Sequence, residues 1–347
     1  MKQRLALTVA GGLLLVAAQA GAQQLTIAEW GDIPSKAGRE AMWDPYTAAT
    51  GVVVKDDVFT GELAKIRAQV ESGAVTWDIA GIEDAEVGAG CDEGILQQID
   101  ASKIPVASDL PKDSISSCGI AYYAAGVGLA YDESAFPNGA PKTWADFFDT
   151  KKFPGKRGMR QTPTYTLEVA LLADGVPLDQ VYDVLVTKEG QDRAFAKLDT
   201  IKSDIVWWTS GSALVQGFVA NEYDMSIAYH GRVCNTNKSG QMKLGMAWDA
   251  GYLMSQNFWV VPTGSPNLEA AEKFMSFALQ PEAQANFMRI SGYVATNPKA
   301  FDLLSEEEKA CMPGTPERAP YALYYSDVAW RDNFTDLSAR FNNWLAN

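Results

Sequence analysis

Few side chains in this sequence are suited to catalysis, and they lie in two places. His230 is the only histidine of the 347 residues, so a multi-histidine zinc site is excluded and any Ser-His-Asp triad would have to use it. Its neighbours Tyr229 and Gly231 form no nucleophile-elbow pattern. The adjacent pair Glu83 and Asp84 could supply an acid and a base, but the two cannot face one reacting atom if one of them caps a helix. The sequence therefore favours binding over catalysis, with an enzyme that uses His230 or Glu83/Asp84 as the alternative.

The four cysteines suit an oxidising compartment. Cys91, Cys118, Cys234 and Cys311 show no CxxC spacing, so neither a redox motif nor a zinc ribbon is indicated. Four thiols allow three pairings, and buried free thiols stay an alternative. We favour Cys91 with Cys118, whose loop of about 27 residues would stabilise the fold by roughly 3 kcal/mol. Cys234 with Cys311 would then join two distant segments.

Alternating strands and helices must position these residues. Strand-like runs at 25–29, 52–54 and 77–82 are separated by helical patterns, which predicts a mainly parallel sheet covered on both faces. Ligands bind beyond the carboxyl ends of the strands in such sheets. Trp30 and Glu83 each directly follow a strand, so we expect both at a ligand crevice.

The length of the chain and its later pattern predict a second lobe. A strand-like run ends near Tyr131, another strand covers 224–229, and an apolar run at 258–262 crosses back. The expected fold class is α/β with two lobes. The predicted units are a signal peptide at 1–22, lobe I at 23–131 and 257–303, and lobe II at 132–256 and 304–347.

The first 22 residues have the pattern of a secretory signal peptide. Lys2 and Arg4 precede an apolar run that closes on small residues at 18–22, and this run is shorter than the roughly 20 residues of a membrane span. The formal charge of -14 argues against nucleic acid as a partner and fits a small cationic or mixed-charge ligand. No P-loop or complete GxGxxG motif is present, and we predict no cofactor and no bound metal.

An ordered set of motifs in the second half of the chain resembles a known family. The motifs are Trp144-Ala145-Asp146-Phe147-Phe148-Asp149, Phe153-Pro154-Gly155-Lys156, Trp207-Trp208-Thr209-Ser210-Gly211, Asn221-Glu222-Tyr223-Asp224-Met225, Tyr229-His230-Gly231-Arg232, Trp259-Val260-Val261-Pro262 and Gly292-Tyr293-Val294-Ala295-Thr296-Asn297. They are similar to those of the periplasmic solute-binding proteins of ABC importers, and in particular of the spermidine/putrescine-binding branch.

The resemblance implies a type II periplasmic binding fold, in which two α/β lobes joined by crossing strands close over a ligand by hinge bending. It also implies a periplasmic, monomeric protein that docks transiently on the transmembrane subunits of an ABC permease. The implied ligand is a small amine-containing solute, either a polyamine or an ω-amino acid such as 4-aminobutyrate.

Several pocket residues follow from the resemblance. Trp30 matches the aromatic residue after the first strand, Tyr229 stands where polyamine binders have a tryptophan, and Tyr293 matches a tyrosine of the family. Trp208 and Ser210 are further candidates from their motif. Aromatic walls suit an alkyl chain and an ammonium group, with cation–π attraction worth about 0.5–2 kcal/mol per contact. Core packing is the alternative for each ring.

The departures from the polyamine-binding pattern concern charge. Thr162 and Tyr165 take the places of an acidic pair, and Asn257 replaces an aspartate of the hinge strand. A buried dication without carboxylate partners costs several kcal/mol per unpaired charge.

Glu83 and Arg232 introduce charges of opposite sign at other positions of the expected pocket. One acid and one arginine suit a ligand with an amine at one end and a carboxylate at the other, and Arg331 is a second candidate for the arginine. Glu83 could instead stabilise a helix start, and Arg232 could be a surface cation. A ferric-ion binder using Tyr122-Tyr123 or Tyr324-Tyr325 is a further alternative.

Overall fold

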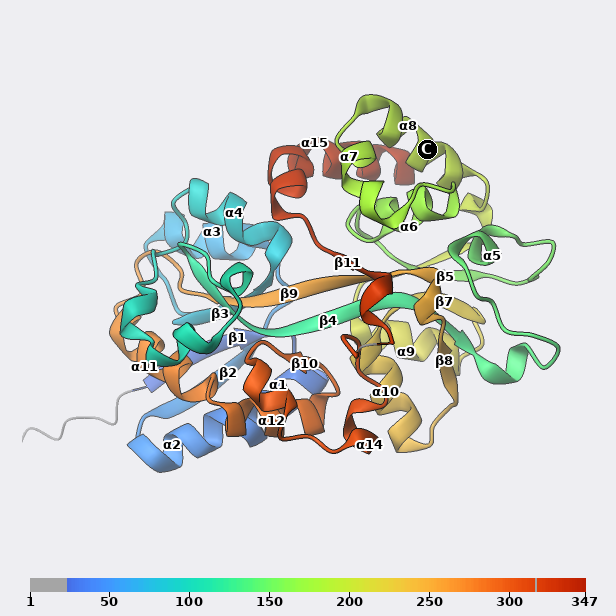
Figure 1. Cartoon of the computed structure of the whole chain (residues 1–347). Coiled ribbons are helices and arrows are strands. Elements are labelled where there is room, and N and C mark those ends of the chain that lie inside the picture. The colour runs from blue at the N-terminus through green and yellow to red at the C-terminus, as the bar shows by residue number, and fades with distance from the viewer. Residues whose placement is uncertain (1–23, 316) are drawn as a thin grey trace, which may run out of the picture.

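The computed structural model describes residues 24–315 and 317–347, which form two α/β lobes joined by a pair of long strands (Figure 1). The signal peptide predicted at 1–22 lies outside the described residues. The strands are β1 (Gln24–Glu29), β2 (Val53–Val58), β3 (Ile79–Glu83), β4 (Gly119–Asp132), β5 (Arg157–Arg160), β6 (Ile205–Trp208), β7 (Met225–Tyr229), β8 (Leu244–Met246), β9 (Tyr252–Val260), β10 (Val294–Ala295) and β11 (Ala322–Tyr324).

The first lobe contains the predicted alternation of strands and helices. β1 lies between β2 and β3 and is parallel to both. Gly51 and Gly73 end the helices α2 (Asp44–Thr50) and α3 (Leu63–Ser72) with φ angles of 77° and 67°, a left-handed conformation that glycine adopts without a Cβ clash.

The other helices of the described residues are α1 (Asp32–Gly38), α4 (Asp84–Asp92), α5 (Trp144–Phe148), α6 (Thr166–Ala173), α7 (Val181–Leu185), α8 (Lys188–Asp199), α9 (Gly211–Val219), α10 (His230–Ser239), α11 (Leu268–Ala278), α12 (Pro281–Ser291), α13 (Pro298–Phe301), α14 (Glu306–Lys309) and α15 (Asp327–Ala346).

The second lobe repeats the pattern with β5 between β6 and β7, parallel to both. Arg157 begins β5 and is fully buried, where its guanidinium donates to the carbonyl oxygens of Phe147, Gly155 and Phe153 at 2.5–2.6 Å. These bonds satisfy most of the donors of a buried cation and fix the turn before β5. They thereby position Arg160 at the other end of the strand.

The strands β4 and β9 connect the lobes and run antiparallel to each other, from Gly119 opposite Val260 to Val127 opposite Leu253. β3 joins β9 on the first lobe, and β7 joins β4 on the second, so one curled sheet passes through both lobes. The apolar run predicted to cross at 258–262 includes the end of β9.

Each lobe has its own hydrophobic core. Along β4, Ala125 packs in the core of the first lobe and Val127 in that of the second, so the core changes before the boundary predicted at 131. Leu304 and Met312 pack with Met288 of α12, which keeps residues 304–312 on the first lobe beyond the boundary predicted at 303.

Both predicted disulfides are confirmed. Cys91 bonds Cys118 and Cys234 bonds Cys311, with Cα–Cα distances of 5.8 and 5.9 Å. Within the described part of the chain, no helix has the length and apolar character needed to cross a membrane.

Candidate functional site

A pocket lies between the lobes where strands from both of them end. Trp30 follows β1 and Glu83 ends β3. From the other lobe, Arg160, Trp208 and Tyr229 end β5, β6 and β7. The cavity has a volume of about 60 Å³. The lining residues are Trp30, Pro34, Thr60, Glu83, Tyr123, Ala125, Arg160, Trp208, Thr209, Ser210, Gly211, Tyr229, Arg232, Asn257 and Tyr293.

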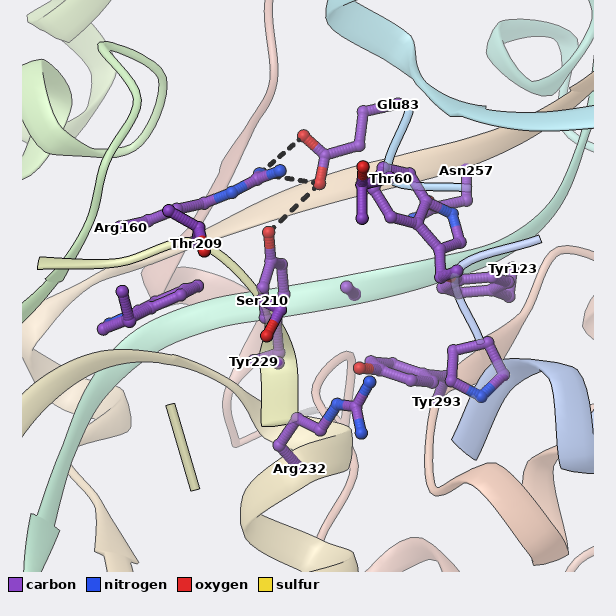
Figure 2. A pocket seen from close by; sticks show the side chains of 15 residues that line it. Thr60, Glu83, Tyr123, Arg160, Thr209, Ser210, Tyr229, Arg232, Asn257 and Tyr293 are labelled. Carbon is purple, nitrogen blue, oxygen red and sulfur yellow. Dashed lines mark hydrogen bonds and ion pairs between the residues drawn. The ribbon is translucent and has the colours of Figure 1, made fainter. Parts of the chain in front are cut away.

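At one end of the pocket, an ion pair joins the lobes (Figure 2). The Nη1 atom of Arg160 donates to both carboxylate oxygens of Glu83, at 2.9 and 2.8 Å, and the hydroxyl of Tyr229 donates to Oε1 at 3.1 Å. Burial acts against the charge of Arg160, but the adjacent Glu83 raises the pKa of the guanidinium well above its usual value. The carboxylate of Glu83 is therefore held by charge-assisted bonds from the second lobe.

A second arginine stands at the other end. Arg232 lies in the first turn of α10, is 5% exposed, and donates through Nη1 to Asp32 of the first lobe. Its Nε atom is buried and has no hydrogen-bond partner. Gly211 makes room for this side chain, because a Cβ there would lie 2.4 Å from that Nε atom. An unpartnered N–H on a buried cation is suited to a ligand carboxylate.

The N-terminus of α9 lies beside Arg232 and carries partial positive charge. Ser210 caps this helix by accepting a hydrogen bond from the N–H of Ala213 at 3.1 Å. Ser210 and Gly211 both line the pocket. A helix N-terminus next to an arginine favours the binding of an anionic group.

Aromatic rings form the walls between the two arginines. Tyr123 and Tyr293 have ring centroids 4.9 Å apart on the first lobe, and Trp208 and Tyr229 have centroids 5.9 Å apart on the second. The indole of Trp208 is anchored by Ser226, which accepts from its Nε1 atom at 3.2 Å. These rings offer flat apolar surface and π faces to a short alkyl chain with a cationic end.

The sequence profile of the bacterial extracellular solute-binding proteins matches residues 41–312 of the chain. The chain belongs to this family. A gamma-aminobutyric acid-binding protein from Pseudomonas aeruginosa is 38% identical to it over 340 residues, which cover 98% of this chain and 96% of that relative.

Two solved structures superpose on this solute-binding protein to different degrees. MotA from A. tumefaciens in complex with glucopine is 30% identical, with a TM-score of 0.88 over 93% of this chain and 100% of its own. AttC from Agrobacterium tumefaciens in an open unliganded conformation is 31% identical, with a TM-score of 0.68 over 93% and 99%. In this solute-binding protein, two ion pairs join the lobes across the cleft.

The structure brings most of the predicted site residues together. Those that line the pocket are Trp30, Glu83, Trp208, Ser210, Tyr229, Arg232, Asn257 and Tyr293. Asn257 lies on β9 directly opposite Glu83 of β3.

Three predicted site residues lie outside the pocket lining. Thr162 shares a hydrogen bond of 2.9 Å with Thr164. Tyr165 is buried behind the wall, where its hydroxyl donates to Ser255 and its ring lies beneath Arg160. Arg331 lies on α15 in a separate cavity beside Gly88 of α4.

Four further residues line the pocket that the sequence did not indicate as lining residues: Arg160, Tyr123, Thr60 and Thr209. Arg160 had a local signal, because it follows the Phe153–Lys156 turn at the distance of a short strand. Tyr123 lies on β4, and only the pairing of β4 with β9 brings it next to Asn257. The pairing of distant strands is not readable from one sequence.

The residues considered for the alternative functions make contacts that do not suit those functions. His230 is fully buried and its Nδ1 atom accepts from the N–H of Gly126 at 2.9 Å. Burial lowers the pKa of this imidazole to about 3. Asp84 accepts from Ser255 and from the N–H of Gln256, so its carboxylate faces the hinge strand instead of Glu83's partners. Of the tyrosine pairs considered for iron, only Tyr123 contributes to the pocket lining.

Proposed function

We propose that this protein is the periplasmic receptor of an ABC importer and captures a short ω-amino acid, such as 4-aminobutyrate. The observation that carries the proposal is the charge of the pocket lining, in which two arginines, the partly exposed Arg160 and the buried Arg232, accompany one carboxylate, Glu83. Counted together with Asp32, the partner of Arg232, the site carries two positive and two negative groups, so a ligand with one group of each sign and no net charge suits it. The 38% identity to a gamma-aminobutyric acid-binding protein supports the same ligand class.

The carboxylate of the ligand is expected to bind at the Arg232 end. The unpartnered Nε atom of Arg232 and the N-terminus of α9 supply donors and positive potential there. The ammonium group then lies toward Glu83, whose carboxylate also accepts from Tyr229, and toward the side chain of Asn257. The rings of Trp30, Tyr123 and Tyr293 enclose the alkyl chain.

Polyamines are poorer ligands for this lining. A diamine would place its second ammonium group at Arg232, where the amino acid has its carboxylate, and this repulsion discriminates against it. The lining combines Arg160 and Arg232 with a single carboxylate, that of Glu83.

Capture proceeds by hinge bending about β4 and β9, and the closed, monomeric receptor then docks on the permease in the membrane. A binding role without catalysis is consistent with the side chains at the site. His230 is a neutral, buried hydrogen-bond acceptor, and Glu83 is already engaged by Arg160. Neither is poised to transfer a proton to or from a ligand at neutral pH.

Calorimetric titration of the mature protein with 4-aminobutyrate, 5-aminovalerate, putrescine and spermidine tests the proposal. We expect the two amino acids to bind and the two polyamines to bind weakly or not at all. In a thermal shift assay, a ligand at 100 times its Kd should stabilise the protein by about 2.7 kcal/mol. Tight binding of putrescine or spermidine, with no response to either amino acid, would overturn the assignment.

A further inference from the structure

The disulfide between Cys234 and Cys311 joins the two lobes next to the hinge strands but outside them, since Pro313, two residues after Cys311, lies against Gly126 of β4. Cys234 lies in α10 of the second lobe, two residues after Arg232. Cys311 follows α14 in a segment that packs on the first lobe. By contrast, Cys91 and Cys118 lie in α4 and just before β4, both within the first lobe.

The segment around Cys311 is firmly attached to the first lobe. Leu304 and Met312, on either side of it, pack against Met288 of α12. The Nε atom of Arg289 on α12 donates to Glu308 at 3.0 Å, and its Nη2 atom donates to the carbonyl of Leu303 at 2.7 Å. Cys311 therefore moves with α12 when the lobes move.

A second contact joins α10 to the first lobe at the same place. The Nδ2 atom of Asn235 donates to the carbonyl of Ser291 at 2.5 Å, across the lobe boundary, and to that of Gly231 at 2.9 Å. Gly292 follows with φ of 73°, and a Cβ there would lie 3.2 Å from the Cβ of Cys234. The two backbones are thus in close approach next to the disulfide.

We propose that the Cys234–Cys311 disulfide, together with Asn235, pins the start of α10 to the first lobe and so holds Arg232 against Tyr293 in the open as well as the closed protein. A ring atom of Tyr293 lies 2.7 Å from the position of a Cβ on Gly231, so the two elements are already in contact. Because the start of α10 stays attached to the first lobe, the lobes separate mainly at the other end of the pocket, where Arg160 pairs with Glu83. The carboxylate end of the site is then preformed, and the amine end assembles on closure.

The mechanism is an increase in the fraction of protein that is competent to bind. The apparent Kd of a ligand rises in inverse proportion to that fraction. The inference rests on the proposed ligand class only for its binding measurement, because the shape of the ligand-free protein is a separate readout.

The test compares two double variants, Cys234→Ser/Cys311→Ser and Cys91→Ser/Cys118→Ser, with the wild type. Small-angle scattering of the ligand-free proteins should show a larger radius of gyration for the first variant only. Titration with 4-aminobutyrate should give a Kd roughly three- to tenfold higher for the first variant, as expected if the competent fraction falls by that factor. The second variant should lose thermal stability and keep the Kd of the wild type.

If Cys234→Ser/Cys311→Ser does not fold, Asn235→Ala with both disulfides intact provides a milder version of the same test, with a smaller rise in Kd expected. Equal scattering and equal Kd for wild type and the folded interlobe variant would overturn the proposal. A wild type that binds no ω-amino acid would refute the proposed function instead, and the scattering comparison would still decide whether the start of α10 is pinned to the first lobe.

Discussion

The two ends of the pocket each hold an arginine of the second lobe against an acid of the first, but they differ in exposure. The side chains of Arg160 and Glu83 are 16% and 10% exposed, so both charges are largely removed from water. Arg232 is similarly buried at 6%, whereas its partner Asp32 is 51% exposed. Arg160 donates to both carboxylate oxygens of Glu83, whereas Arg232 donates to one oxygen of Asp32, so the two pairs differ in geometry as well as in the solvation of the acid.

This difference separates a structural ion pair from one that is available to a ligand. Two desolvated charges depend on each other, because removal of one leaves the other buried and uncompensated. An acid that is half in water contributes little to the pair and gives up little when a ligand carboxylate approaches the arginine. The Arg232 end is therefore the place where an anionic group exchanges most easily.

The largest effect is expected from Glu83→Ala, which leaves Arg160 buried without its carboxylate. The free energy of unfolding should fall by about 3–5 kcal/mol, the usual cost of breaking a buried pair. Chemical denaturation measures this change. Glu93→Ala provides a matched control, because Glu93 makes the same kind of pair with Arg67 at 38–41% exposure and should cost less than about 1 kcal/mol. Equal losses for the two variants would show that burial of the pair does not matter.

The next largest effect is expected on the pH dependence of stability, when the wild type is compared with Glu29→Gln. This substitution alters neither arginine pair. Glu29 is 1% exposed behind Trp30, accepts from the hydroxyl of Tyr122 at 2.5 Å, and has a pKa raised by burial from 4.5 to about 7. Because its folded-state pKa is the higher one, its contribution to stability is present below pH 4.5 and is lost as the pH rises through about 7. Over this pH range, the unfolding free energy of the wild type should fall by on the order of 3 kcal/mol relative to that of the variant. If chemical denaturation gave the same difference in unfolding free energy between wild type and variant at every pH from 4.5 to 8, this assignment would be contradicted.

The sequence predicted the frame of the site better than its charge balance. Trp30 and Glu83 were located by the rule that ligands bind beyond strand ends, and the rule depends only on local pattern. Arg160 was missed although it obeys the same rule, because β5 is only four residues long and lacks the apolar alternation of a predicted strand. The pairing of Arg160 with Glu83 involves residues 77 positions apart, and no periodicity encodes such a contact. Thr162 and Tyr165 were placed by family position, and the structure shows them beside the pocket wall instead.

Arg232→Ala should weaken the binding of 4-aminobutyrate by at least tenfold. A charge-assisted bond to a carboxylate is worth about 1.5–3 kcal/mol, and each 1.4 kcal/mol corresponds to a factor of about ten. Putrescine affinity should rise instead, because the loss of Arg232 removes the repulsion of the second ammonium group. Calorimetric titration with both ligands checks the result, with Arg331→Ala as the control arginine outside the pocket. A loss of affinity in Arg331→Ala instead of Arg232→Ala would move the carboxylate to the other candidate.

Asp32→Asn is expected to have the smallest effect and to test the comparison most directly. Asp32 has φ of 48°, and asparagine is chosen because it tolerates this left-handed conformation and still presents an oxygen to Arg232 and Ser212. Since the lost charge is half exposed, the Kd of 4-aminobutyrate should change by less than about threefold, equivalent to less than 1 kcal/mol. Dissociation should become somewhat faster, because a bond that holds the lobes together is weaker, and stopped-flow tryptophan fluorescence resolves that rate. A tenfold or larger rise in Kd would mean that Asp32 stabilises Arg232 as strongly as Glu83 stabilises Arg160. The solvation of the acid would then not distinguish the two ends of the pocket.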